Sequence, residues 1–254
     1  MMRLMSILVL MVTIFGASTS FAANVDVSQK DKSLAQYEVD RWKKQVVRSD
    51  KYYKDKLLNL NKNKGVYFVN RVRGLRSMYP FTSFYTPFSD RLVDKMSEYA
   101  YAVDTSNDPA VINENLQEYR KILNLHLVNV GVLDFAITMA RVNAKFGSAR
   151  YYESVRDIMI DGLMTPEIDG KSPSKAFNIV TKSEEIHLLA KIGGEIGKSE
   201  MYDVEGTYFN VYDVTLENGD FTQIFMNVTD PIKKTYIKQH LEEKEDTYTL
   251  PGMQ

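Results

Sequence analysis

The chain has three histidines, His126, His187 and His240, and histidine is the residue type that most often serves as a metal ligand or an acid–base catalyst. No two of them stand four residues apart, the spacing that places two histidine ligands for a metal on one helix face. His187 lies beside the apolar stripe of a short predicted helix, and His126 lies between two leucines at a predicted helix end. These contexts are typical of structural histidines. We therefore expect no metal site and no cofactor.

Motifs that mark nucleophiles and phosphate sites are absent from the sequence. It contains no G-x-S-x-G elbow, no G-x-x-x-x-G-K-[ST] loop, no G-x-G-x-x-G loop and no cysteine. Acidic pairs such as Glu184/Glu185 and Asp213/Glu217 could serve a glycosidase. A chain with 33 acidic residues offers many such pairs, so they carry little weight. The sequence thus favours a role other than catalysis, with a carboxylate-pair hydrolase as the alternative.

The segment 79–88 (YPFTSFYTPF) holds five aromatic rings and two prolines. The prolines exclude a regular helix, and five rings facing water would form an exposed apolar patch. The segment either lines a groove for a ligand or peptide, which requires exposed rings, or is held against the core by its rings. The second interpretation is the simpler one. If the groove exists, its candidate binding residues are Tyr79, Phe81, Phe84, Tyr85 and Phe88.

The first 22 residues have the pattern of a secretory signal. Arg3 precedes an apolar run over 4–15, and Ser20-Phe21-Ala22 has the small-x-small form that signal peptidases accept. The run is shorter than the roughly 20 apolar residues that cross a bilayer. We expect cleavage after Ala22 and a periplasmic or secreted protein without stable membrane insertion. An uncleaved anchor is the alternative.

The length and composition of the mature chain indicate that it folds without disulfide bonds. Removal of residues 1–22 leaves 232 residues, enough for one large domain or two small joined ones. The absence of cysteine excludes disulfides, thiol chemistry and a lipoprotein anchor. The 32 Lys and Arg nearly balance the 33 Asp and Glu, and the basic cluster over 41–64 alternates with acids as on a solvated helix face. We therefore expect no nucleic-acid partner.

Hydrophobic periodicity predicts a helical first half. Apolar residues recur at steps of three and four over 34–60 and again over 89–164, whereas 66–79 has no clear period. Helices of this length with short joints are typical of tetratricopeptide-like hairpins or of a plain helical bundle. Three cap signals divide the second stretch into helices: Ser89, Asp108-Pro109 and Ser148.

Strands are expected after the turn-rich joint at 165–173. The predicted order is a strand over 176–181, a helix over 183–192 that ends at Gly193-Gly194, three strands over 200–204, 208–216 and 221–228, and a last helix from Asp230-Pro231 to about 243.

Asn218-Gly219 predicts a two-residue type I′ turn, in which both residues have positive φ. This turn places Glu217 opposite Asp220 and puts Phe221 on the same face as Val214. Both faces of the hairpin are apolar enough to be covered, one by the helix over 183–192.

The predicted fold class is α+β, with N-terminal antiparallel helical hairpins, tetratricopeptide-like, packed on a small C-terminal antiparallel β-sheet with one or two helices. The predicted divisions are a signal peptide at 1–22, a helical domain at 23–164, a small α+β part packed on it at 165–242, and a flexible tail at 243–254.

Several stretches together resemble a domain family of unknown function in exported bacterial proteins, mostly of Bacteroidetes. The resemblance implies a tetratricopeptide-like helical half and a small β-containing half, and it supports export. It implies no catalytic or binding residue, because none is established for the family. The stretches that carry it are VRGLRSMY at 72–79, YTPFSD at 85–90, DGLMTPEIDGKSPSKAF at 161–177, SEE at 183–185, YFNVYDV at 208–214 and QIFMN at 223–227.

The sequence therefore predicts an exported binding or adaptor protein that presents its helical half to a protein or peptide partner. A hydrolase that uses a carboxylate pair is one alternative. A structural protein that dimerises through residues 79–88 is another. The sequence indicates neither the ligand nor the oligomeric state.

Expression of the full chain in a Gram-negative host tests the signal. We expect the mature chain in the periplasm or medium, with Ala23 at its N-terminus by mass spectrometry. Charge at the cleavage site blocks signal peptidase, so Ala22→Arg should accumulate the uncut precursor. A chain that stays in the cytoplasm with Met1 in place would contradict the prediction.

Overall fold

The computed structural model describes residues 29–60 and 65–246. The chain divides into two compact units, Met1–Glu38 and Val39–Gln254, and the sheet and all of its packing lie in the second. The predicted signal at 1–22 and most of the predicted tail at 243–254 lie outside the described residues.

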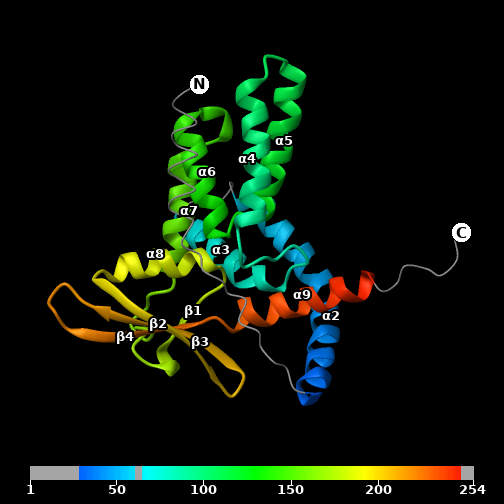
Figure 1. The fold of residues 1–254 in the computed structure, drawn as a ribbon. Coiled ribbons are helices and arrows are strands. Elements are labelled where there is room, and N and C mark those ends of the chain that lie inside the picture. Colours follow the sequence, from blue (N-terminus) through cyan, green and yellow to red (C-terminus); the bar gives the residue numbers. More distant parts are fainter. Residues whose placement is uncertain (1–28, 61–64, 247–254) are drawn as a thin grey trace, which may run out of the picture. The chain divides into compact units, whose positions relative to one another are not determined.

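The first half of the described chain is helical. Its helices pack as neighbours, α4 on α5 and α6 on α7, with α4 also on α6 and α3 on α7 (Figure 1). The segment without a clear period is α3. Among the described helices, none combines the length and the apolar character that a membrane span requires. The helices are α2 (Gln29–Leu58), α3 (Gly65–Met78), α4 (Asp90–Thr105), α5 (Pro109–Leu125), α6 (Val130–Val142) and α7 (Ala149–Asp161).

The predicted cap signals are confirmed. The Asp108 carboxylate accepts a hydrogen bond from the backbone N–H of Ala110 at 2.8 Å, and Ser148 caps α7 by accepting from Tyr151. Ser89 is the N-cap residue of α4, without a side-chain bond to the helix. Each side-chain cap satisfies a backbone donor that the helix itself leaves open, which stabilises the helix by about 1 kcal/mol.

Large rings fill the space between these helices. Tyr119 of α5 and Phe146 are fully buried, and their ring centroids lie 4.9 Å apart. Phe146 belongs to a short 3₁₀ turn, Ala144–Phe146, that follows α6. Burial of a side chain of this size stabilises the fold by roughly 1.5–3 kcal/mol. The helical half therefore has an apolar core of its own.

The second half is a four-stranded sheet with two helices, so the predicted α+β class is confirmed. The strand order is β1-β4-β3-β2. The prediction of a purely antiparallel sheet is wrong, because β1 runs parallel to β4. The predicted strand over 176–181 is reduced to two residues. The elements are β1 (Phe177–Asn178), α8 (Lys182–Ile192), β2 (Glu195–Val204), β3 (Thr207–Thr215), β4 (Phe221–Asn227) and α9 (Thr229–Asp246).

The two-residue turn lies between β2 and β3, one hairpin earlier than predicted. Val204 pairs with Thr207, and the two residues between them, Glu205 and Gly206, have φ values of 52° and 77°. Positive φ at both central positions is the mark of a type I′ turn. Glu205 is the one non-glycine residue of the described chain with positive φ.

The prediction for Asn218-Gly219 is wrong in its register. Gly219 has a φ of 85° but Asn218 does not have positive φ. The Gly219 N–H donates to the carbonyl of Leu216, and the Leu216 N–H donates to the carbonyl of Asp220, both at 2.8 Å. The loop therefore has three residues rather than two. One extra residue moves every side chain of β4 to the opposite face, so Phe221, which is 66% exposed, lies opposite Thr215 and not on the face of Val214.

Gly170 holds the joint before β1 against the sheet. Its carbonyl accepts from the Phe225 N–H of β4 at 2.7 Å, its φ is 72°, and an added Cβ would overlap the ring of Phe177. We expect Gly170→Ala to lower the free energy of unfolding by roughly 2–4 kcal/mol, from backbone strain together with the clash.

Gly206→Ala is the matched control. Gly206 has nearly the same φ, 77°, and open space around the added Cβ, so it reports backbone strain alone, about 1 kcal/mol. Urea denaturation of both variants measures the difference. Equal losses would show that the Phe177 contact does not position the joint.

Candidate functional site

The end of α8 leaves part of the sheet uncovered. The helix packs on the sheet face that carries Asn210 and Tyr212, and it stops at Gly193, whose N–H donates to the carbonyl of Leu189 at 3.0 Å. Beyond this point the same face continues with Leu216 and Ile224. A pocket of about 440 Å³ lies there, between the end of α8, the sheet and the joint at 164–171.

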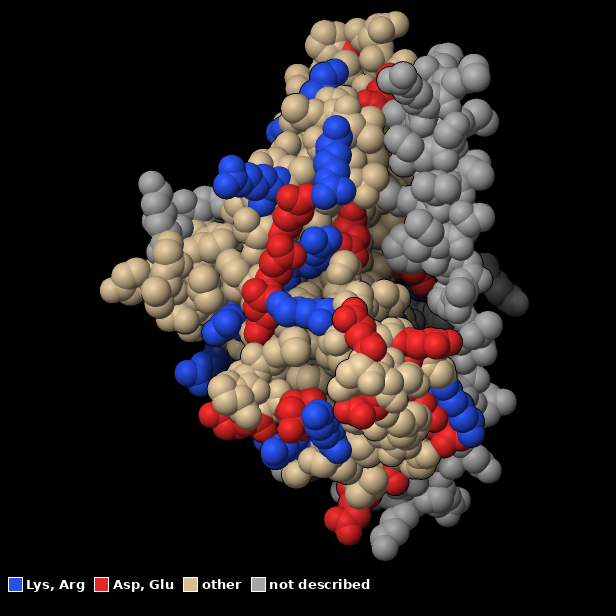
Figure 2. Space-filling view, turned by 90° about the vertical axis from the view of Figure 1, so that its left-hand side faces the viewer, with Lys and Arg blue, Asp and Glu red and all other residues tan. Residues whose placement is uncertain are grey.

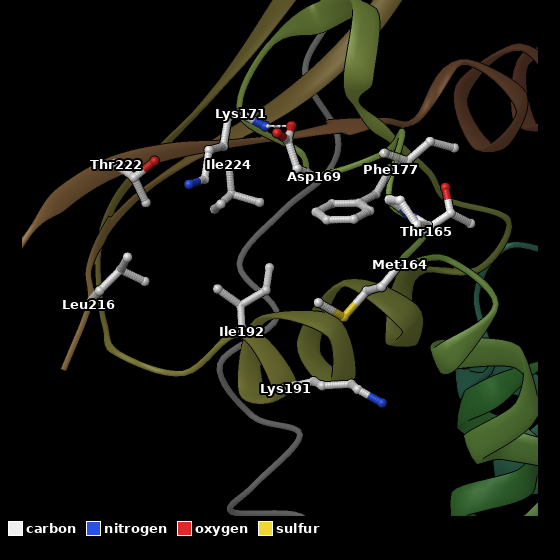
Figure 3. Close-up of a pocket in the computed structure, with 12 residues that line it drawn as sticks. Met164, Thr165, Asp169, Lys171, Phe177, Lys191, Ile192, Leu216, Thr222 and Ile224 are labelled. Carbon is white, nitrogen blue, oxygen red and sulfur yellow. Dashed lines mark hydrogen bonds between the residues drawn. The ribbon is translucent and has the colours of Figure 1, made fainter. Parts of the chain in front are cut away.

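Apolar side chains make up most of the pocket wall. Phe177 and Ile224 are buried, while Ile168, Ile192 and Leu216 are half-buried. Figure 3 shows Leu216, Ile192 and the Phe177 ring arranged around one space, so the three elements contribute to a common wall. The remaining lining residues are Met164, Thr165, Pro166, Asp169, Lys171, Lys191 and Thr222.

Three charged side chains stand at the rim of the pocket. The Asp169 carboxylate accepts a hydrogen bond from the backbone N–H of Lys171 at 3.0 Å. This hydrogen bond lowers the pKa of Asp169, and the nearby charge of Lys175 lowers it further. Lys191 forms an ion pair with Asp161. The Lys171 side chain extends along the side of the pocket that carries Thr222 and Ile224 (Figure 3). The rim therefore carries two positive charges and one negative charge.

At the end opposite the pocket, the first turn of α8 is anchored by a buried ion pair. Glu184 is fully buried and accepts two hydrogen bonds from the Arg76 guanidinium of α3, each 2.8 Å long. It also accepts from the backbone N–H groups of Val180 and Thr181, at 2.7 and 3.3 Å. Four donors to one carboxylate compensate for its loss of water. Glu184 is thus a structural anchor.

The neighbouring acid, Glu185, faces the sheet. It accepts hydrogen bonds from the Asn210 side-chain amide at 3.0 Å and from the Tyr212 hydroxyl, and pairs with Lys182 at 2.7 Å. Burial, with the charge of Glu185 beside it, raises the pKa of Tyr212 well above its ordinary value. Tyr212 therefore stays protonated and donates. Both acids of the predicted pair are committed to packing, and neither lines the pocket.

His187 belongs to a half-exposed charged cluster. Its Nε2 lies 2.7 Å from a carboxylate oxygen of Asp134 on α6, and Arg156 of α7 binds the other oxygen at 3.1 Å. Figure 2 shows acidic and basic side chains intermixed on the face where α7 and α8 lie. His187 therefore belongs to a polar network with the Asp134–Arg156 ion pair that joins three helices.

The aromatic segment is divided between core and surface. Tyr79, in the 3₁₀ turn Tyr79–Phe81, and Tyr85 are buried, Phe81 and Phe84 are half-buried, and Phe88 is 37% exposed. The prediction that Tyr79 and Tyr85 bind a ligand is wrong, because both side chains are buried and a ligand at the surface cannot reach them. The predicted groove required exposed rings, and these two rings instead tie the segment to the core.

Specific partners hold the two buried rings. The Tyr79 hydroxyl lies 2.7 Å from Nδ1 of His126, and the Tyr85 hydroxyl donates to the carbonyl of Val180 at 2.7 Å. Burial raises the pKa of both hydroxyls, so they stay protonated. His126 is buried at the end of α5, as a structural histidine. His240 lies in α9, in a part whose side chains are not described.

Within the described residues, no three His, Asp or Glu side chains gather as a metal site would require. Sequence reasoning missed Arg76, which binds Glu184, and Lys171, which lines the pocket. Arg76 is one of three arginines within six residues, and nothing local distinguishes it from Arg71 or Arg73. Its partner was detectable, because Thr181 and Glu184 have the T-x-x-E spacing of a helix start.

Comparison with known proteins finds no relative. No family description, curated protein or solved structure matches this chain. The resemblance to the exported bacterial domain family therefore stays a prediction.

Replacement of one partner tests the buried ion pair. Glu184→Gln keeps the shape but leaves the Arg76 guanidinium facing a neutral group, and we expect a loss of about 3–5 kcal/mol in the free energy of unfolding. Glu118→Gln, which removes the exposed i,i+3 partner of Lys121, should cost less than about 1 kcal/mol. Chemical denaturation measures both, and equal losses would contradict the anchoring role.

Proposed function

We propose that this chain is an exported binding or adaptor protein whose pocket beside the end of α8 takes an apolar group that carries or adjoins a negative charge. The ligand group is the side chain or acyl-like end of a partner molecule. The helical half, which we take to be tetratricopeptide-like, presents further surface to the same partner. Export rests on the secretory pattern of residues 1–22.

One observation carries the proposal: an apolar pocket of about 440 Å³ with a lysine beside it. Ligand pockets are concave, largely apolar, and carry a few polar groups that orient the ligand. Ile224 and Phe177 supply the apolar wall, and Lys171 supplies a positive charge at the rim. A purely polar ligand would leave this wall without a partner. An apolar anion matches both properties.

A carboxylate-pair hydrolase has less support. Retaining and inverting glycosidases need two carboxyl groups that flank one open cleft. Glu184 and Glu185 are buried and face different partners, Arg76 on one side and Asn210 on the other. The pocket carries one carboxylate, Asp169.

A fluorescent apolar anion, an anilinonaphthalene sulfonate, is the probe for the pocket. We expect saturable binding to the mature chain with one dominant site. Met164→Glu places a charge in the apolar wall at a side chain that is 38% exposed, and it should weaken binding by at least about tenfold, or roughly 1.4 kcal/mol. Lys171→Glu should weaken binding to a similar extent by reversing the charge at the rim.

Val111→Glu on α5 is the matched control, since Val111 is also 38% exposed and does not line the pocket. It should bind the probe like the unsubstituted chain. Circular dichroism establishes that each variant is folded. Unchanged binding by both pocket variants, or equal weakening by the control, would reject the pocket as the site.

A further inference from the structure

The β2 strand is an uncovered edge of the sheet. All ten of its residues are exposed, and among the described strands β3 alone pairs with it. Four large apolar side chains on it are 40–50% exposed: Ile196, Met201, Tyr202 and Val204. An exposed, long, apolar edge presents unpaired backbone groups that can pair with another strand. The opposite edge differs, because β1 and Gly170 bond to β4 there.

The β2–β3 turn determines which backbone groups point outward. Residues that close a two-residue turn exchange both hydrogen bonds, so Val204 directs its N–H and C=O toward Thr207. Direction alternates along an antiparallel strand, so Tyr202 and Glu200 also face β3. The backbone groups of Asp203, Met201 and Ser199 therefore face the open edge. The regular edge ends near Ser199, because the register shifts between Ile196 and Ser199.

This edge is complementary to itself. Antiparallel pairing of two copies about Met201 sets Met201 opposite Met201 and Ser199 opposite Asp203, both in outward-facing positions. Glu200 then lies opposite Tyr202, whose hydroxyl already donates to Glu200 within one chain. No acid opposes an acid in this register.

The next register toward the start of β2, centred on Glu200, would place Glu200 opposite Glu200, and the one beyond it is also unfavourable. Pairing about Ser199 would place Glu195 opposite Asp203, two acids directly across from each other, which destabilises a strand pair. It would also extend the pairing into the irregular stretch between Ile196 and Ser199.

From this complementarity we propose that β2 pairs with β2 of a second copy of this chain, antiparallel and centred on Met201, to form a two-fold dimer with a continuous eight-stranded sheet. The contact is a short one, with six backbone hydrogen bonds at most, which predicts a dimer that dissociates on dilution. It does not depend on the proposed pocket, which lies at the end of α8.

Met201→Pro is the decisive variant for the mature chain. Its missing N–H is the one that faces the open edge, and proline is tolerated at outward positions of edge strands. Sedimentation velocity over a range of concentrations should show a dimer for the unsubstituted chain. We expect Met201→Pro to raise the dimer dissociation constant by at least about tenfold. Met201→Lys, which sets two cations against each other at the two-fold axis, should do the same without a backbone change.

A single cysteine at the proposed two-fold axis tests the register in which the two β2 strands pair. The natural chain has no cysteine, and paired residues across the two-fold axis lie about 5.5 Å apart, within reach of a disulfide. Under mild oxidation Met201→Cys should form a covalent dimer. Val142→Cys on α6, with a side chain of similar exposure (43% against 40%), should form no covalent dimer.

Three results would overturn the proposal. They are a natural chain that is monomeric at every concentration, a dimer that persists in both Met201→Pro and Met201→Lys, and equal crosslinking at residues 201 and 142. The first would leave the edge to another occupant, and the second would place the interface elsewhere.

Discussion

The arrangement of the second half depends on one buried ion pair, between Arg76 of α3 and Glu184 in the first turn of α8. A carboxylate that is buried away from water is stable only when its oxygens accept hydrogen bonds from the protein. Glu184 accepts four such bonds. Two of them come from a guanidinium whose planar fork matches the carboxylate. This geometry fixes both the position and the direction in which α8 leaves the helices.

The next residue extends the same logic to the sheet. Glu185 faces away from Glu184 and accepts from Asn210 and Tyr212 of β3, so α8 is bound by charge to the helices on one side and to the sheet on the other. Without these partners, burial of two adjacent carboxylates would lower the free energy of unfolding, because both charges would lose water and gain no hydrogen bonds. With them, α8 is a rigid layer of defined length. The pocket exists because this layer ends at Gly193 before the sheet does.

The sequence predicts features that depend on neighbouring residues, such as helix caps, but not features that depend on contacts between distant residues. The caps at Asp108 and Ser148 involve bonds across two or three residues, so a short window contains both partners. The hairpin register was missed because Asn-Gly suits two loops, one with both residues at positive φ and one that needs only the glycine there. Glu205-Gly206, which forms the type I′ turn, is a less typical pair for it.

The site shows the same division. The joint at 165–173 was recognisable as turn-rich, but the pocket also needs residues up to Ile224. The aromatic segment was correctly excluded from a regular helix. Which of its rings are buried depends on His126 and Val180, residues far along the chain, so composition could not separate Tyr85 from Phe88.

The separation of Arg76 and Glu184 along the chain, 108 residues, also has a kinetic meaning. Glu184 cannot leave water at low cost until α3 is in place, so the docking of α8 on the helices closes one of the longest loops of the fold. Contacts of this sequence separation form late, after local hairpins. A hairpin closed by a two-residue turn needs only local contacts, so the β2–β3 hairpin can form before α8 docks. In a refolding experiment we therefore expect amide protection to appear in the β2–β3 hairpin before it appears in α8.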